Sequence, residues 1–126
     1  MFVKDLNTCE QFMAGDATHL RELLHPDKED LAISYSLAHA LVRPGDTSFR
    51  HRLRTSEVYY ILQGQGRMHI NDETAEVQPG KAIYIPPHAL QYIENTGSGD
   101  LEFLCIVDPP WRQEDEEVMD GDRGTR

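Results

Sequence analysis

A histidine and a glutamate near the middle of the chain, His51 and Glu57, stand six residues apart in a segment, residues 45–66, that reads GDTSFRHRLRTSEVYYILQGQG. Proteins use imidazole nitrogens and carboxylate oxygens together to bind divalent first-row transition metals. Without a metal, the same two groups can accept and donate a proton. Either chemistry requires the fold to bring the two side chains to one place.

The residues around this pair alternate in a way that predicts β-strands. Glu57, Tyr59 and Ile61 share one face of a segment rich in aromatic and β-branched residues, and period 2 favours a strand over a helix. If His51 and Leu53 lie across from them in a β-hairpin, His51 and Glu57 point into one interior. The pattern therefore predicts a polar site inside a β-barrel.

This segment resembles the first sequence motif of the cupin family. Gly45, His51, Glu57 and Gly64 stand at the spacing of that motif. The departure is Leu53, which occupies the position where the family carries a second metal-binding histidine. The resemblance therefore implies a metal site that keeps His51 and Glu57 and lacks one imidazole.

A later segment resembles the second cupin motif. The matching positions are Gly80, Pro86 and Asn95. At two other positions His88 replaces a glycine and Gln91 replaces a metal-binding histidine. The similarity spans about residues 36–108. It implies an all-β double-stranded β-helix, a jelly-roll barrel, in which the usual three-histidine, one-glutamate metal set is reduced to His51, Glu57 and Gln91.

Other histidines are candidates for the missing ligands. His39 lies in the apolar segment 31–42, and an adjacent strand of that kind can supply an imidazole or simply bury a satisfied one. His25 is either a capping residue or part of a lid, and His88 remains a further alternative. The expected ligands of a divalent Mn, Fe, Ni, Cu or Zn ion are His51, Glu57, Gln91 and His39.

Tyrosines and arginines surround the same segment. Tyr59 shares the face of Glu57, and these two are the candidate catalytic side chains. Tyr84 and Tyr92 either line the same opening or fill a narrow barrel. Five of the twelve basic residues fall nearby: Arg43, Arg50, Arg52, Arg54 and Arg67. They suit an anionic ligand, but alternation points the middle three away from His51, which favours pairing with the acidic tail or a neighbouring subunit.

Composition limits the class of protein. A chain of 126 residues suits one domain, and a formal charge of −10 argues against binding nucleic acid, which favours a basic surface. No apolar run approaches the roughly 20 residues that cross a bilayer, and the N-terminus lacks the apolar core of a signal peptide. We therefore expect a cytoplasmic protein without a membrane partner. Cys9 and Cys105 are far apart, and Cys105 fits core packing better than a disulfide.

Short strands separated by glycine, proline and asparagine turns predict an all-β barrel without help from the resemblance. We expect residues 1–30 to form a cap or an edge strand, residues 31–110 the barrel, and residues 111–126 a flexible acidic tail, with Trp111 packed on the barrel or a partner. One outward face is apolar, which predicts a homodimer. Its residues are Val58, Tyr60 and Leu62.

The sequence leaves more than one function open. No nucleophile elbow, phosphate loop, dinucleotide-binding glycine pattern or paired-cysteine motif occurs in it. The resemblance implies a metal-dependent isomerase, oxygenase or decarboxylase acting on a small oxygen-rich molecule, a sugar or a carboxylate. The substitutions at Leu53 and Gln91 favour instead a non-catalytic binding or sensing module that has lost the metal. Proton transfer by His51 and Glu57 without a metal is a further alternative.

Overall fold

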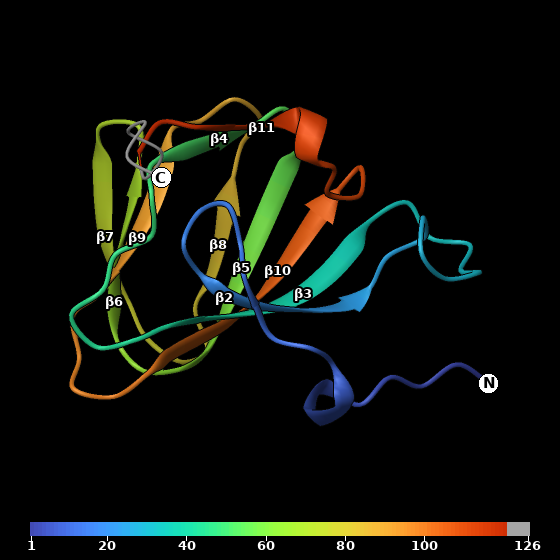
Figure 1. Ribbon diagram of the computed structural model, residues 1–126. Coiled ribbons are helices and arrows are strands. Elements are labelled where there is room, and N and C mark those ends of the chain that lie inside the picture. Colours follow the sequence, from blue (N-terminus) through green and yellow to red (C-terminus); the bar gives the residue numbers. More distant parts are fainter. Residues whose placement is uncertain (121–126) are drawn as a thin grey trace.

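Two antiparallel β-sheets packed face to face make up the computed structural model, which describes residues 1–120 (Figure 1). The first sheet has the strand order β1 (Phe12–Met13), β2 (His19–Leu24), β3 (Ser36–Val42), β10 (Leu101–Asp108), β5 (Ser56–Gln63) and β8 (Ala82–Ile85). The second has the order β11 (Glu116–Val118), β4 (His51–Leu53), β9 (Gln91–Asn95), β6 (Gly66–Ile70) and β7 (Glu73–Val77). The predicted all-β jelly roll is confirmed.

Within residues 1–120, the helices are two short 3₁₀ turns, η1 (Leu6–Thr8) and η2 (Gln113–Asp115). No helix in the described part of the chain is long and apolar enough to cross a membrane. The N-terminal residues supply β1 and β2, which form one edge of the six-stranded sheet.

The chain changes sheets between β4 and β5. β4 pairs with β9 and β11, whereas β5 pairs with β10 and β8, so the hairpin expected from His51 and Glu57 does not form. The reason is that Arg54 and Thr55 carry the chain across the sandwich rather than back along the same sheet. His51 and Glu57 consequently come from facing sheets, which still directs both toward the interior.

The core fills one end of the sandwich, and the inward-facing positions become polar toward the other end. Phe103 and Ile61 are opposite each other in the β10–β5 ladder, and both are fully buried. Burying a side chain of this size contributes roughly 1.5–3 kcal/mol. Along the inward face of β5, Ile61 is followed by Tyr59 and then Glu57. The same strands that build the core therefore deliver polar groups to the opposite end.

Residues 111–120 of the C-terminal segment pack along β4, where the sequence predicted a flexible tail. β11 pairs with β4, and the guanidinium of Arg50 donates to both carboxylate oxygens of Asp120 at 2.7–3.0 Å. Arg52 lies 3.9 Å from Glu117. The predicted pairing of these two arginines with the acidic tail is thus confirmed. The last part of that tail, residues 121–126, lies outside the described residues.

Candidate functional site

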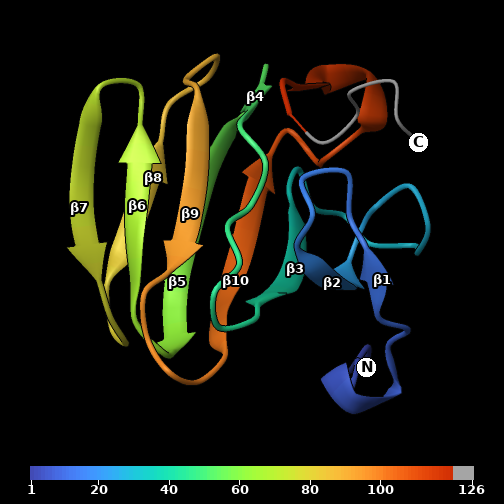
Figure 2. The ribbon, with the colours of Figure 1, turned by 60° about the vertical axis from the view of Figure 1, so that its left-hand side comes forward.

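A cavity of about 200 Å³ opens at the polar end of the sandwich. Strands β2, β3, β5 and β10 form one wall, and β4, β11 and the β1–β2 loop form the other. The β1–β2 loop and the C-terminal segment lie at the same end of the molecule as β4 in both ribbon views (Figures 1 and 2). The cavity is large enough to hold a small molecule.

Three side chains from separate parts of the chain converge in this cavity. His51 Nε2 lies 3.6 Å from Asp16 Oδ2 and 4.0 Å from Glu116 Oε2. One ligand atom from each of the three residues can be chosen such that all lie within 4.8 Å of one another. His51 is only 2% exposed, so the imidazole is held in a fixed position by its surroundings.

Hydrogen bonds orient His51 toward the two carboxylates. Its Nδ1 lies 2.9 Å from the carbonyl oxygen of Phe49. Because a carbonyl only accepts, Nδ1 carries the hydrogen, and in the neutral ring Nε2 presents its lone pair to the cavity. Burial lowers the pKa of His51, but the surrounding carboxylates outweigh this effect and leave the pKa above its usual value.

The two carboxylates of this cluster are oriented by their own neighbours. Asp16 Oδ1 accepts hydrogen bonds from the backbone N–H and the hydroxyl of Thr18 at 3.1 and 2.7 Å, which leaves Oδ2 for His51. Glu116 lies opposite Leu53 in the β11–β4 ladder and accepts a hydrogen bond from the Trp111 side chain. Burial raises the pKa of Glu116, and His51 opposes the rise.

Glu57 lies in the same cavity and belongs to a short hydrogen-bonded chain. The Tyr59 hydroxyl donates to Gln91 Oε1 at 3.1 Å, and Gln91 Nε2 donates to Glu57 Oε1 at 3.2 Å. Burial raises the pKa of Glu57 to about 8, and the nearby His51 limits the rise. Burial also raises the pKa of Tyr59 well above its usual value, so the phenol stays protonated.

Three of the expected site residues are thus in direct contact, and His51 lies beside them. Glu57, Gln91 and Tyr59 form the hydrogen-bonded chain, and His51 is directly opposite Gln91 in the β4–β9 ladder. Both hydrogen-bonding ends of the Gln91 amide are engaged within this chain. Gln91 is therefore hydrogen-bonded to Tyr59 and Glu57, and it is not one of the residues of the Asp16–His51–Glu116 cluster.

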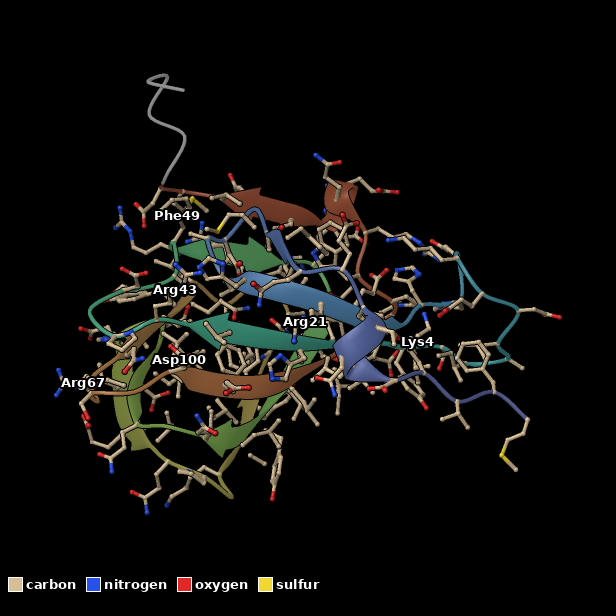
Figure 3. All side chains as sticks on the ribbon, turned by 60° about the horizontal axis from the view of Figure 1, so that its bottom comes forward. Lys4, Arg21, Arg43, Phe49, Arg67 and Asp100 are labelled. Atoms are coloured by element: carbon tan, nitrogen blue, oxygen red, sulfur yellow. The ribbon has the colours of Figure 1, made fainter. Side chains whose placement is uncertain are left out.

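His39 does not join this cluster, which corrects its expected place as a fourth ligand. Ala38 and Ala40 line the cavity, so the intervening side chain of β3 projects from the opposite face of the sheet. There His39 Nε2 contacts Glu102 Oε1 at 2.9 Å. Arg21, its partner in the β2–β3 ladder, lies beside β3 in Figure 3.

The remaining candidates also lie away from the cavity lining. His25 is buried, and its Nε2 donates a hydrogen bond to the Trp111 carbonyl at 2.7 Å. It therefore holds the start of the C-terminal segment in place and does not line the cavity. His88 is exposed. Tyr84 is 63% exposed, and Tyr92 stacks on His69 with ring centroids 4.0 Å apart. Neither tyrosine lines the opening.

Comparison with known proteins places the fold and the site in context. A family model described as a cupin domain matches residues 38–107. The chain belongs to the cupin family. An uncharacterised protein of Methanocaldococcus jannaschii is 41% identical over 110 residues, which cover 86% of this chain and 87% of that protein.

Two further matches to this cupin come from Thermotoga maritima, one in sequence and one in structure. An oxalate-binding protein is 39% identical over 51 residues, which cover 40% of this chain and 42% of that protein. A crystal structure of a predicted oxalate decarboxylase is 26% identical with a TM-score of 0.74, covering 86% of this chain and 99% of that one.

Asp16 and Glu116 lie outside the residues that the cupin model matches, and sequence reasoning missed both. Asp16, two residues before Thr18, has the spacing of an Asx turn, which could have predicted a fixed carboxylate but not its partners. Glu116 belongs to an acidic segment whose composition is typical of a solvated tail. The sequence offered no signal that either residue reaches the barrel.

Proposed function

We propose that this cupin binds one divalent transition metal through His51, Asp16 and Glu116 and uses it on a small oxygen-rich molecule in the cavity. The observation that carries the proposal is the convergence of three donor atoms on the cavity wall. Two ligands of one metal, each about 2.1 Å from it, lie roughly 3.0–4.2 Å apart. The His51 distances of 3.6 and 4.0 Å fit that interval.

The charges of the site support the same proposal. Asp16, Glu57 and Glu116 place three carboxyl groups around one imidazole in a largely buried space. Such a group of acids is stabilised when a cation neutralises it. Imidazole and carboxylate together suit Mn, Fe or Zn, so the donor set fits the family's metal chemistry even though Leu53 cannot bind a metal.

Glu57 is the group proposed to move a proton. It lines the cavity, and Gln91 holds one of its oxygens by a hydrogen bond. The bound metal would polarise a carbonyl or hydroxyl oxygen of the substrate. Glu57 would then take a proton from the substrate and return it at another position, which is the chemistry of an isomerase. Tyr59 contributes by holding Gln91.

The test is metal content in matched variants of the full chain, purified without chelator or nickel resin. Glu116→Gln removes a ligand that points into the cavity, whereas Glu117→Gln alters the adjacent, outward-facing residue of β11. We expect about one metal per wild-type chain. His51→Ala and Glu116→Gln should weaken metal binding at least roughly tenfold, and Glu117→Gln should not. Equal metal affinity in the two glutamate variants contradicts the proposed site.

A second candidate is a binding module that works without metal. It is favoured by Leu53 at one family ligand position and by the hydrogen-bonded amide of Gln91 at another. In that case a titration of the protein with Mn(II) or Zn(II) should detect no metal binding that the His51→Ala substitution removes. The same metal titration therefore separates the two candidates.

A further inference from the structure

The wall of the cavity formed by the six-stranded sheet is mostly apolar. Its apolar contributions are Leu20, Ala38, Ala40, Phe103, Cys105 and Val107. Phe12 and Trp111 also line the cavity. The facing wall carries His51, Asp16 and Glu116. Glu57 and Tyr59 of β5 are polar exceptions on this sheet, so a ligand that fills the cavity meets the polar groups of the proposed site on one side and mainly hydrocarbon along β3 and β10 on the other.

Several of the remaining polar groups of the lining are already bonded within the protein. Ser36 Oγ accepts from the backbone N–H of Trp111 at 2.9 Å. Among the described residues that line the cavity, Lys28 is the one lysine or arginine, and its ammonium donates to Glu22 at 2.6 Å. A sugar phosphate would find no unpaired lysine or arginine here, and sugar hydroxyls placed on the apolar wall would lose their hydrogen bonds to water.

We infer that the ligand of this cavity has an apolar body, aromatic or alkyl, and a single polar end with two adjacent oxygens, as in an α-hydroxy or α-keto acid. This inference rests on the proposed function, because the metal would hold the oxygens. The apolar body lies against the β3–β10 wall. Burial of apolar surface contributes roughly 25 cal/mol per Å² of area removed from water. A small dianion without an apolar part gains nothing from this wall.

The small side chains of Ala38 and Ala40 leave space in the cavity for the apolar part of the ligand. Ala38 lies opposite Cys105 in the β3–β10 ladder, and both line the cavity. Leucine at position 38 would project its extra carbons into the space of the ligand, while the three proposed metal ligands stay on other strands and loops. Valine at the same position is a smaller change that keeps strand propensity high. Ala75→Leu, on the exposed β7, is the matched control.

The test uses Trp111, the single tryptophan of the chain, which lines the cavity and reports its occupancy by fluorescence. Full-length protein saturated with Zn(II) is titrated with mandelate and with glycolate, two α-hydroxy acids that differ by a phenyl group. We expect mandelate to bind at least roughly tenfold more tightly. Ala38→Leu and Ala38→Val should reduce this preference without changing zinc affinity, and Ala75→Leu should preserve it.

Titration of the metal-free protein tests the apolar wall of the cavity without depending on the metal site. Benzyl alcohol should change the Trp111 emission saturably, and ethylene glycol should not. The inference is overturned if glycolate binds zinc-loaded protein as tightly as mandelate, or if benzyl alcohol gives no saturable change. If zinc fails to bind, the proposed function fails, and the benzyl alcohol titration then decides the apolar-body inference by itself.

Discussion

Replacement of Glu57 by glutamine should make the stability of the metal-free protein less dependent on pH. Burial raises the pKa of Glu57 from 4.5 to about 8. The folded protein therefore keeps the carboxyl proton over a range in which the unfolded chain has released it. The folded state loses stability as the pH rises from 4.5 to 8, because deprotonation favours the unfolded chain there. Glutamine at position 57 removes this loss and can still accept the hydrogen bond from Gln91.

The interval between the two pKa values sets the size of the effect. At 1.36 kcal/mol per pH unit, the step from 4.5 to about 8 corresponds to at most about 5 kcal/mol in the free energy of unfolding. Relaxation around the charged carboxylate reduces this value. Relative to wild type, Glu57→Gln should therefore gain a few kcal/mol between pH 5 and pH 8.

Urea unfolding of both proteins at pH 5, 6, 7 and 8, in the presence of a chelator, measures this difference directly. Glu117→Gln, at a side chain that is 70% exposed, is the control and should follow the wild type at every pH. Saturating Zn(II) should shrink the effect, because a nearby cation favours the carboxylate form. A difference between Glu57→Gln and wild type that stays constant from pH 5 to pH 8 refutes the reasoning.

Two other predictions concern assembly and the fold. The outer face of the six-stranded sheet exposes two apolar side chains, Tyr60 at 41% and Leu62 at 43%. We therefore expect light scattering to give twice the 14.4 kDa chain mass for wild type and a monomer for Tyr60→Asp. A wild-type monomer at high micromolar concentration contradicts this prediction. Gly64 has φ +88, and an added Cβ would lie 2.8 Å from Leu101 Cα and still closer to the Asp100 carbonyl oxygen. Gly64→Ala should lower the free energy of unfolding by roughly 1–3 kcal/mol. The control is Gly80→Ala, which should cost less because φ is +93 there but an added Cβ would meet nothing within 4 Å. Equal losses of stability in urea unfolding would show that the close approach at Gly64 does not matter.

The sequence by itself determined the strands and the inward direction of His51 and Glu57. Alternation is a local property of an extended backbone, so it holds whichever strands pair later. That is why both side chains face the interior although the predicted hairpin between them does not form. The outward direction of Arg50 and Arg52 follows from the same local geometry, whereas their acidic partners Asp120 and Glu117 reach them because β11 pairs with β4.

Local patterns failed where a strand carries apolar residues on both faces. β3 carries apolar residues on its outward side, Leu37 and Leu41, as well as on its inward side, Ala38 and Ala40. Polarity therefore does not alternate along it, and the sequence could not say which face holds His39. The packing of the two sheets decided the question, because it directs Ala38 and Ala40 into the cavity and leaves His39 on the opposite face.

Only the tertiary structure brought Asp16 and Glu116 to His51. Asp16 arrives on the β1–β2 loop, and Glu116 arrives because β11 pairs with β4. An acidic residue far from its partner in sequence is indistinguishable from a solvated one, since its charge alone does not identify the group that it faces. The long-range pairing of the strands decides which group each carboxylate faces. It places Asp16 and Glu116 beside His51, the histidine that the sequence had already predicted to point inward.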